Sequence, residues 1–419
     1  MMGQEKNMFF HNAWRNVIGG FLIMALLHSM LQTCFSLFLL PVTGDMHIST
    51  TAFSGCSSIV AIASMFAAPK IGKLMEHSKI IKKLMILCII GMGLSYASYS
   101  LATSIIHMYI SAVFLGIFSC GATILPITII LTKWFYERRG LAVGITLSGS
   151  GIGGSIIFPF LTEFIATHGW RNSFVLFGFL MIIIEIPVVC FIMAPDPAEI
   201  GCIPYGYHAD SPKSSSTDKL SFSELKEHSF FYVYLIGIFS ICVAGYGSLG
   251  FLSASLSESY SPALAHAIIP FFLFLLTPAK ILLGWMYDRI HTRAGTIYVT
   301  VTFAMAFILL QIPDDEQLMW IMSILFAFGI SSGTVSPSFI TGELFGTKEF
   351  GILFGFVYAV CMGAMAVANP LLAAINDLTS SYNLAWSACM TLCLLSGVCI
   401  YYADISYKNL LKKRQKETA

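Results

Sequence analysis

Long apolar runs separated by short polar segments make up most of the chain. Each run is about 20 residues long, the length that an α-helix needs to cross about 30 Å of hydrocarbon. The pattern predicts an all-α membrane protein with twelve transmembrane helices, at about residues 16–41, 50–69, 84–103, 106–131, 141–166, 172–194, 229–256, 265–286, 295–312, 317–341, 350–375 and 382–406.

One polar segment is much longer than the others and divides these helices into two groups of six. It covers residues 195–228 and includes Pro-Asp-Pro-Ala-Glu, Ser-Pro-Lys-Ser-Ser-Ser-Thr and a short amphipathic piece around Phe222–Leu225. Such a composition is typical of a linker. We predict a six-helix bundle over 1–194, a cytoplasmic linker over 195–228, and a second six-helix bundle over 229–419 with a short basic cytoplasmic tail.

The two groups of helices repeat one another. The pair Gly140 and Gly144 recurs 211 residues later, and the loop segment 72–76 recurs 212 residues later as segment 284–288. Internal duplication of a transporter-like bundle places a binding site between the two copies, near the middle of the bilayer.

Composition agrees with a membrane protein. The chain of 419 residues is 57% hydrophobic and only 11% charged, whereas a soluble protein has roughly 25% charged residues. So few charges cannot cover a water-facing surface. The N-terminal segment lacks a signal-peptide cleavage pattern, and the first apolar run continues into a full span, so we expect no removable signal peptide.

The distribution of positive charge predicts the topology. All lysines and arginines except Lys280 and Arg171 lie in the predicted tails, in the linker or in loops that follow even-numbered helices. Positively charged loops stay on the cytoplasmic side. We therefore predict a multi-pass protein of the cell membrane (inner or plasma membrane) with both termini in the cytoplasm.

Several functional classes are disfavoured. The formal net charge of +1 gives no basic footprint for nucleic acid. The eleven cysteines occur singly inside apolar runs, so we expect neither disulfides nor a metal site. The sequence contains no G-x4-G-K-[ST] loop for ATP and no His, Asp and Glu cluster with ligand spacing. We expect no cofactor, no enzymatic activity and a monomer.

A single lysine interrupts the apolar run 271–293. Lys280 lies 15 residues into a predicted helix that starts near residue 265, hence near mid-depth. A charge there costs about 2.5 kcal/mol or more, which makes it a candidate functional residue. Lys280 is either a point-charge anchor for an anion, without the rigid fork of an arginine, or the structural partner of an intramembrane carboxylate.

The twelve helices, the six-plus-six repeat and the turn Gly284-x3-Asp288-Arg289 together resemble the major facilitator superfamily. In that family the turn lies between helices two and three and is repeated between helices eight and nine. The resemblance implies two pseudo-symmetric bundles whose cytoplasmic ends are held together by charged groups. The gating residues it implies are Gly284, Asp288, Arg289, Glu76, Arg138 and Arg139.

A longer motif narrows the resemblance. Residues 133–149 read Lys-Trp-Phe-Tyr-Glu-Arg-Arg-Gly-Leu-Ala-x-Gly-x3-Ser-Gly, followed by Pro159 and by Gly-Trp-Arg at 169–171. This is similar to the monocarboxylate transporter and oxalate–formate antiporter branch. In that branch a cation four residues before the glycine of the turn after helix eight binds the substrate carboxylate. Lys280 has this spacing from Gly284.

The chain departs from that branch at three positions. Its cation is Lys280, where the relatives usually have arginine. Leu276 replaces the aspartate of proton-coupled members, and a residue at about Val360 replaces the second lysine of the oxalate–formate exchanger. The resemblance thus implies a small carboxylate, disfavours a dicarboxylate that needs two cations, and leaves the energy source open.

Other polar residues near mid-depth are candidates for the same site. His28 and Gln32 share one face of the first helix, which lines the cavity in the resembling fold, and His28 can carry a proton near neutral pH. Glu185 is a second proton-coupling candidate, on a helix that is peripheral in that fold. Alternatively, His28 is a packed histidine and Glu185 makes a local hydrogen bond.

Further candidates for substrate binding are polar residues at helical spacing. Ser and Thr also form ordinary contacts between membrane helices, so each has this alternative interpretation. The segment 149–154 fits G-x-G-x-x-G, but it lies inside a predicted membrane helix, and we interpret it as close helix packing. The remaining candidates are Ser119, Thr123, Tyr246, Ser332, Ser336, Tyr358 and Asn369.

Taken together, these features predict a secondary transporter that moves a small organic anion by alternating access, either as an exchanger or coupled to protons. Its partners would be the anion, protons or a counter-anion, and the lipid bilayer. Two alternatives stay open: a carrier of neutral or cationic compounds in which Lys280 is structural, and a membrane sensor built on a transporter fold.

Overall fold

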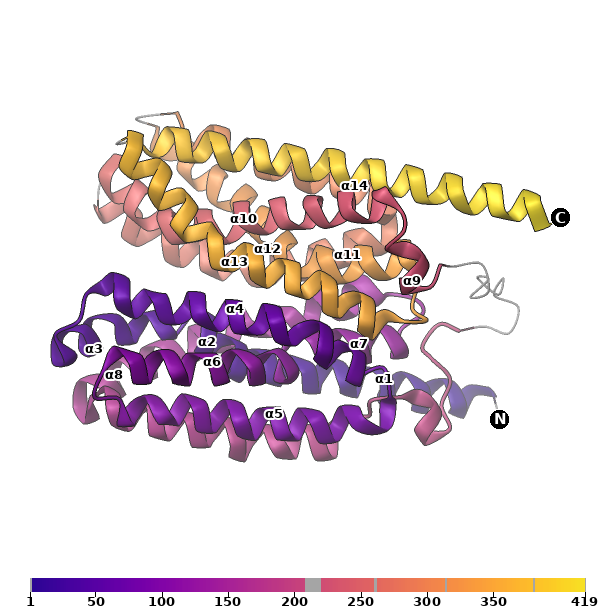
Figure 1. Ribbon diagram of the computed structural model, residues 1–419, viewed down its shortest axis with the longest axis horizontal. Coiled ribbons are helices and arrows are strands. Elements are labelled where there is room, and N and C mark those ends of the chain that lie inside the picture. The colour runs from indigo at the N-terminus through magenta and orange to yellow at the C-terminus, as the bar shows by residue number, and fades with distance from the viewer. Residues whose placement is uncertain (1, 208–219, 260–261, 313–314, 380, 419) are drawn as a thin grey trace.

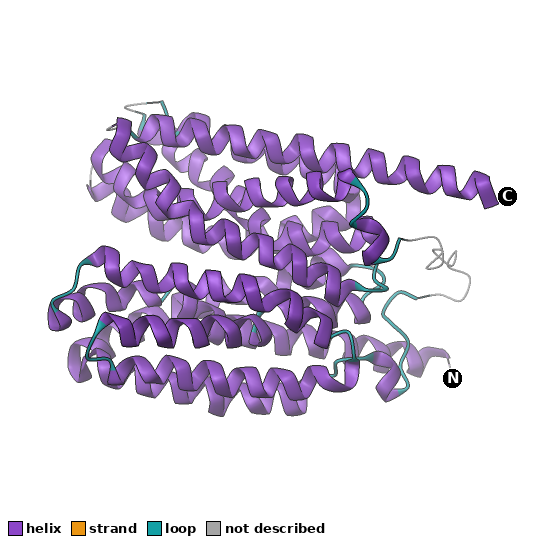
Figure 2. Cartoon of the chain, in the orientation of Figure 1, coloured by secondary structure: helices purple, strands orange, loops and turns teal. Residues whose placement is uncertain are grey.

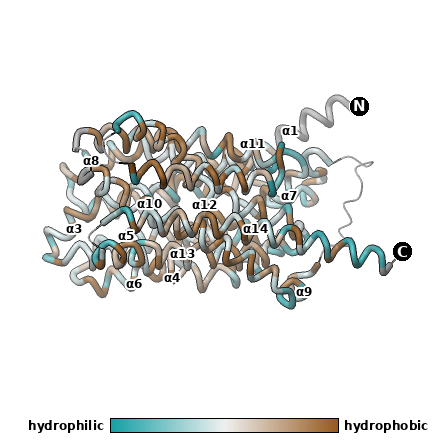
Figure 3. The backbone as a smooth tube through the Cα atoms, turned by 90° about the horizontal axis from the view of Figure 1, so that it is seen from above, coloured by the Kyte–Doolittle hydropathy of each residue, from teal (hydrophilic) through white to brown (hydrophobic). Residues whose placement is uncertain are grey.

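The computed structural model describes residues 2–207, 220–259, 262–312, 315–379 and 381–418. Long helices run side by side along the molecule (Figure 1), and no strand forms among the described residues (Figure 2). Both termini lie at one end of the bundle, called here the terminal end. Hydrophilic residues concentrate at the ends of the bundle and in the last part of α14 (Figure 3).

The helices follow one another in two groups. The first group consists of α1 (Met2–Ile23), α2 (Ser29–Gln32), α3 (Leu39–Met46), α4 (Thr50–Leu74), α5 (Ser78–Ser98), α6 (Ile105–Ala122), α7 (Ile124–Trp134) and α8 (Arg139–Pro187). The second consists of α9 (Phe222–Leu225), α10 (Ser229–Ser259), α11 (Pro262–Leu309), α12 (Glu316–Phe345), α13 (Phe350–Thr379) and α14 (Tyr382–Thr418). We call these groups the first half and the second half.

Among the described residues, ten helical stretches are long and apolar enough to cross a membrane by length and composition. Two of them, Arg139–Ile192 with 54 residues and Ala267–Leu309 with 43, greatly exceed the roughly 20 residues of one crossing. Each has a kink at one residue with left-handed backbone, Gly169 (φ 81°) and His291 (φ 57°). The ten stretches are therefore compatible with the twelve predicted crossings.

Glycines set the packing of the first half. A Cβ atom on Gly149 would lie 2.3 Å from the carbonyl oxygen of Phe21, and one on Gly153 would lie 1.9 Å from that of Ala25. Only glycine allows the backbones of α1 and α8 to approach this closely. The interpretation of segment 149–154 as a packing motif is thus confirmed.

The described parts of the predicted linker pack against both halves. Tyr205 forms a β-bridge with Phe135 at the start of the linker. The amphipathic piece predicted around Phe222–Leu225 is confirmed as α9, whose first turn is closed by a capping box between Ser221 and Glu224. The ring of Phe222 packs on Phe356 of α13 at 4.8 Å. Residues 208–219 lie outside the described residues.

Candidate site between the two halves

The first interface between the halves joins α8 to α11. A Cβ atom on Gly284 would lie 2.1 Å from the carbonyl oxygen of Gly140, and one on Gly144 would lie 2.5 Å from the carbonyl oxygen of Lys280. Further along α8, a Cβ atom on Gly151 would lie 2.6 Å from Oγ1 of Thr277. The two backbones are therefore in van der Waals contact over this part of their length.

The second interface joins α4 to α13 with the same geometry. A Cβ atom on Gly72 would lie 2.3 Å from the carbonyl oxygen of Gly351, and one on Gly355 would lie 2.8 Å from that of Ala68. These residues match those of the first interface at the repeat offsets of 211 and 212, since 351 − 140 and 355 − 144 are 211 and 284 − 72 and 280 − 68 are 212. The duplication therefore produces two related interfaces.

Acidic side chains close the terminal end of both interfaces. The carboxylate of Asp288 accepts hydrogen bonds from the backbone nitrogens of Gly140 at 2.7 Å and Leu141 at 2.8 Å, at the start of α8. Glu76 accepts one from the nitrogen of Gly351 at 3.0 Å, at the start of α13. A carboxylate is stabilised at a helix N-terminus, where unpaired N–H groups and the helix dipole favour negative charge. Each contact links one half to the other.

Arg139 adds a third contact between the halves. Its guanidinium donates from Nη2 to the carbonyl oxygen of Phe339 on α12 at 3.3 Å and lies 5.4 Å from the centre of the Phe339 ring. A Cβ atom on Gly342 would lie 2.7 Å from Nη1 of Arg139. The side chain from the first half is therefore inserted against the second.

Two of the six predicted gating residues do not take part in these contacts. Arg138 is exposed and precedes α8 with left-handed backbone (φ 55°). Arg289 is also exposed, with its guanidinium 5.2 Å from the centre of the Trp285 ring on its own helix. Helix-end contacts and the half-buried Arg139 therefore connect the halves here, while these two arginines are exposed.

Lys280 lies at the first interface and is only 7% exposed. Its Nζ atom donates to Oγ of Ser150 at 2.8 Å and to the carbonyl oxygen of Leu147 at 3.3 Å. Both acceptors are neutral and belong to α8, in the other half. No carboxylate of the described residues lies within ion-pair distance of Nζ. This geometry disfavours the alternative of a structural pair with an intramembrane acid.

Ser150 connects Lys280 to the first helix. Besides accepting from Lys280, its hydroxyl donates to the carbonyl oxygen of Leu147 at 2.9 Å. Its own carbonyl oxygen accepts from Oγ of Ser29 at 2.8 Å. Ser29 directly follows a π-helical turn over Met24–His28, a local irregularity that is frequent at functional sites. A hydrogen-bonded chain thus runs from the first helix through α8 to Lys280.

The sequence interpretation did not single out Ser150. Its signal is its place between Gly149, which contacts Phe21 of α1, and Gly151, which contacts Thr277 of α11. A residue between two such glycines lies where three helices meet, so a hydroxyl there can reach both neighbours.

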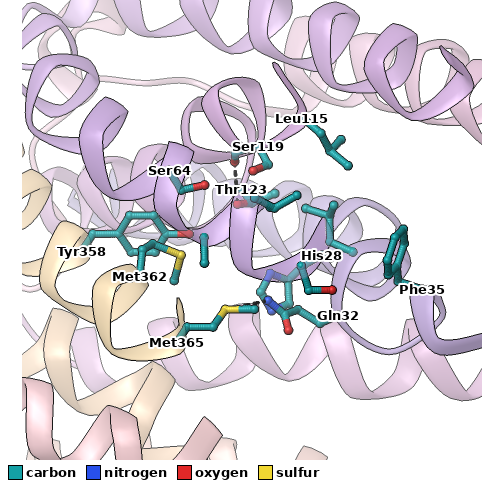
Figure 4. Close-up of a pocket in the computed structure, with 14 residues that line it drawn as sticks. His28, Gln32, Phe35, Ser64, Leu115, Ser119, Thr123, Tyr358, Met362 and Met365 are labelled. Atoms are coloured by element: carbon teal, nitrogen blue, oxygen red, sulfur yellow. Dashed lines mark hydrogen bonds between the residues drawn. The ribbon is translucent and has the colours of Figure 1, made fainter. Parts of the chain in front are cut away.

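A small cavity of about 30 Å³ lies between α13 and the first half (Figure 4). Five predicted substrate-binding residues meet there: His28, Gln32, Ser119, Thr123 and Tyr358. Residues that the sequence did not single out complete the lining: Leu31, Phe35, Ser57, Val60, Ala61, Ser64, Leu115, Met362 and Met365. The volume holds about one or two waters, far less than the roughly 300–1,000 Å³ of a ligand pocket. Side chains must therefore move to admit a ligand.

Residues that line the cavity are hydrogen-bonded across the two halves. Gln32 donates from Nε2 to the sulfur of Met365 on α13 at 3.4 Å, as Figure 4 shows. His28 directly precedes Ser29, which donates to the carbonyl oxygen of Ser150, the partner of Lys280, although Lys280 is not part of the cavity wall. The cavity and the lysine are thus neighbouring parts of the region between the halves.

Five other predicted residues lie elsewhere. Ser332 donates to Gly329 of its own helix, and Ser336 is hydrogen-bonded to Tyr287 at 2.8 Å within the second half. Tyr246 on α10 and Asn369 on α13 do not line the cavity, and Asn369 lies beside Gly250 of α10. Glu185 is fully buried outside the cavity, and neither of its carboxyl oxygens has a hydrogen-bond partner among the described residues.

No group of three or more His, Cys, Asp or Glu side chains is placed to hold a metal ion in the described part of the chain. The cavity lining contains one histidine and no carboxylate. What the arrangement can do chemically is bind a small solute through one buried ammonium group and several hydroxyl, amide and imidazole groups.

Two bundles of membrane-length helices with a buried cation and a small cavity between them are an arrangement typical of membrane carriers. A sequence model of the Major Facilitator Superfamily matches residues 21–343. The chain belongs to this superfamily of membrane transporters.

Named relatives are similar over most of the chain. Monocarboxylate transporter 2 of Mesocricetus auratus is 24% identical over 389 residues, covering 86% of this chain and 78% of the relative. Monocarboxylate transporter 1 of Homo sapiens is 23% identical, covering 96% and 87%. The crystal structure of the human organic anion transporter MFSD10 (TETRAN) superimposes with a TM-score of 0.67 at 13% identity, covering 94% of this chain and 99% of that one. This last likeness shows a shared fold.

Proposed function

We propose that this transporter carries a small organic anion, of the short monocarboxylate class, by alternating access. The observation that carries the proposal is Lys280: a buried ammonium at the interface of the halves, whose partners among the described residues are a hydroxyl and a backbone carbonyl. Burying a charge against neutral groups alone is costly. A carboxylate that enters the interface supplies the missing opposite charge.

Binding would replace a weak set of contacts by a strong one. The bonds from the ammonium group to Ser150 and Leu147 have an ionised donor but neutral acceptors, whereas a carboxylate adds an opposite charge, whose attraction is stronger at a buried site than in water. An anion therefore competes favourably with Leu147 and Ser150 for the ammonium group. Because lysine is a point charge without directional preference, neighbouring groups such as His28 and Gln32 would orient the anion.

The position of Lys280 also suggests why the empty carrier would change conformation less readily than the loaded one. Lys280 belongs to the second half, and its acceptors belong to the first. Alternating access moves the halves relative to one another around the site, which would separate Lys280 from those acceptors. An empty carrier would then expose an unpaired cation to an apolar interface, while a loaded carrier would move a neutral ion pair.

His28 is the stronger of the two candidates for proton coupling. It lines the cavity and directly precedes Ser29, which is hydrogen-bonded to the Lys280 partner Ser150, whereas Glu185 is buried outside the cavity. Exchange predicts fast counterflow with negligible net flux. Proton coupling predicts net uptake that follows an imposed pH gradient and is lost in His28→Ala.

The names of the similar proteins support the substrate class, since both sequence relatives are called monocarboxylate transporters.

We further propose that the protein lies in a plasma or inner membrane with both termini on the cytoplasmic side. The backbone approaches of Gly140 to Gly284 and of Gly72 to Gly351, together with the caps Asp288 and Glu76, lie at the start of α8, the end of α4 and the start of α13, which is the terminal end. With that orientation the structure would be closed toward the cytoplasm.

The decisive test is a panel of labelled C1–C6 carboxylates, taken up by proteoliposomes at two pH values. Losing the only ionic contact costs about 2–5 kcal/mol, so Lys280→Gln should lower uptake of the preferred anion by about thirtyfold or more. Lys73→Gln, an exposed lysine of α4, is the matched control and should leave uptake unchanged. Thermal stabilisation by neutral compounds alone, unaltered in Lys280→Gln, would instead support the carrier of neutral solutes.

A further inference from the structure

A second and larger cavity lies at the terminal end of the first half, away from the transport site. Its volume is about 290 Å³, and it is lined by residues of α1, of the start of α5 and of the segment that follows α8. Two membrane-length stretches begin or end here, at Ser78 and Ile192. The cavity therefore lies at the depth where the hydrocarbon core ends and lipid head groups begin.

Two cations line this cavity. Arg15 donates from Nη2 to the carbonyl oxygen of Phe191 at 2.6 Å, and Lys82 donates from Nζ to that of Cys190 at 2.7 Å. Each bond uses one donor, whereas a guanidinium has five N–H donors and an ammonium three. Both side chains are half-buried, so these bonds hold the charged groups at the wall of the cavity while further donors are left over.

The negative charge in the lining offsets these cations only in part. The lining includes Asp196 and Glu199. Asp196 already forms an ion pair with Lys133 at 3.5 Å and accepts from the hydroxyl of Ser78. Despite partial burial, these contacts hold the pKa of Asp196 below its usual range. The cavity thus has two cations against one acid without an ion-pair partner in the described residues, Glu199.

The surface beside the cavity is apolar and exposed. Phe191 has 77% of its surface exposed and Ile18 has 55%. In a membrane protein such side chains at the end of a span face lipid acyl chains. Cations directly next to a lipid-facing apolar surface are the arrangement that binds an anionic head group while the acyl chains stay in the bilayer.

We propose that this cavity, formed by α1, α5 and the segment 190–200, binds the phosphate of an anionic phospholipid through Arg15 and Lys82. Asn12 contributes an amide at the rim. The segment 190–200 leads into the predicted linker, so the bound lipid connects α1 and α5 to the start of that linker. This site is separate from the transport site and does not depend on the identity of the transported solute.

The test measures lipid binding to the purified full-length protein in detergent, by native mass spectrometry and by thermal stabilisation. The probes are phosphatidylglycerol, diacylglycerol with the same acyl chains, and soluble glycerol phosphate at equal concentration. We expect binding and stabilisation by phosphatidylglycerol only, since diacylglycerol lacks the phosphate and glycerol phosphate lacks the chains.

The variant Arg15→Gln/Lys82→Gln should weaken phosphatidylglycerol binding by about tenfold or more, because each lost bond is to a charged group. Lys83→Gln, an exposed lysine next to Lys82 that does not line the cavity, should bind like the unaltered protein. The lipid-dependent shift is compared within each variant, so that a change in basal stability does not affect the result.

Three outcomes would overturn the proposal. If the double variant binds phosphatidylglycerol as well as the unaltered protein does, Arg15 and Lys82 do not take part in binding. Equal stabilisation by diacylglycerol would mean that the phosphate is not recognised. Equal stabilisation by glycerol phosphate would mean that the cavity is a site for soluble phosphate and that no lipid is required.

Discussion

The two interfaces between the halves share their backbone geometry and differ in their chemistry. In both, a pair of glycines lets two helices touch, and an acid caps the start of the facing helix. The first interface adds Lys280 and Ser150. The repeat offsets place Ala68 (280 − 212) and Cys361 (150 + 211) at these positions in the second.

This difference shows how the duplicated fold was specialised. The glycine contacts are needed twice, because both interfaces must close for the halves to meet. A single cation suffices for one carboxylate, and a second buried charge would only add its desolvation cost. The second interface is accordingly apolar where the first is polar, and α13, one of its two helices, contributes Tyr358, Met362 and Met365 to the cavity.

After Lys280, the largest expected effect on transport comes from the glycines. A Cβ atom in Gly284→Ala would lie 2.1 Å from a backbone oxygen of Gly140, and backbone atoms cannot turn aside as a side chain can. Overpacking of this kind costs about 1–3 kcal/mol or more. We expect uptake of the preferred anion to fall by about tenfold or more, measured as initial rates in proteoliposomes.

Gly72→Ala, its counterpart in the second interface, should have an effect of similar size, because its Cβ atom would lie 2.3 Å from the oxygen of Gly351. Gly44→Ala is the control, since a Cβ atom there meets no atom within 4 Å. Normal uptake in both Gly284→Ala and Gly72→Ala would show that these close approaches are not needed for transport.

Substitutions of the two capping acids, Asp288 and Glu76, should have effects of different size at the two interfaces. Asp288→Asn replaces an acceptor of two backbone N–H groups, while Glu76→Gln changes an acceptor of one. A hydrogen bond to a charged group contributes about 1.5–3 kcal/mol. Asp288→Asn should therefore shift the conformational equilibrium by about tenfold or more toward separation at the terminal end, whereas Glu76→Gln, which keeps an oxygen for its single N–H partner, should shift it little.

Spin labels on exposed positions can measure this shift. Labels at Tyr136 and Ile290 span the first interface, and labels at Lys73 and Lys348 span the second. We expect Asp288→Asn to increase the population of long distances more than Glu76→Gln does. Equal populations in both variants would mean that the caps do not set the equilibrium.

Ser150 should have a moderate effect. Ser150→Ala removes one of two acceptors of Lys280 and leaves the carbonyl oxygen of Leu147. Because the carbonyl oxygen of Leu147 remains as an acceptor, we expect the KM for the anion to change by about three- to tenfold, as fits a net loss of about 0.5–1.5 kcal/mol, and the anion preference to persist. Uptake kinetics over a range of concentrations give this value.

Two matched variants control for helix packing. Ser148→Ala removes a buried hydroxyl that donates only to Ile145 of the same helix, and Cys361→Ala alters the position equivalent to Ser150 in the second interface. Both should leave KM within about twofold. If Ser148→Ala changed KM as much as Ser150→Ala does, the effect would come from the packing of α8 and not from the hydrogen bond to Lys280.

The smallest effect concerns pH. In this conformation burial raises the pKa of Glu76 above its usual value, despite the hydrogen bond from Gly351. A conformation closed at the terminal end therefore binds the proton more tightly than one in which Glu76 meets water. This relative stabilisation is present below the usual carboxyl pKa and is lost as pH rises through the raised value.

The same spin labels at Lys73 and Lys348 should report more of the closed population as pH falls through that range. Glu76→Gln should remove this pH dependence while leaving the labels in place. A pH response that persists in Glu76→Gln would assign it to another group.

The sequence by itself determined the class of protein and much of the architecture. Apolar runs of membrane length, the offsets of 211 and 212 and the turn at Gly284–Arg289 depend on local periodicity, which is readable in one dimension. The segment 149–154 was interpreted as packing because its setting was helical, and the contact with Phe21 and Ala25 agrees.

Only the tertiary structure decided which polar residues meet. Tyr246, Ser332, Ser336 and Asn369 have helical spacing like Ser119 and Thr123, yet only the latter line the cavity. Helix rotation and neighbour identity, which arise from packing, determine the direction of each side chain. For the same reason the sequence placed Lys280 at mid-depth but could not name Ser150 as its partner, since the two residues are 130 positions apart.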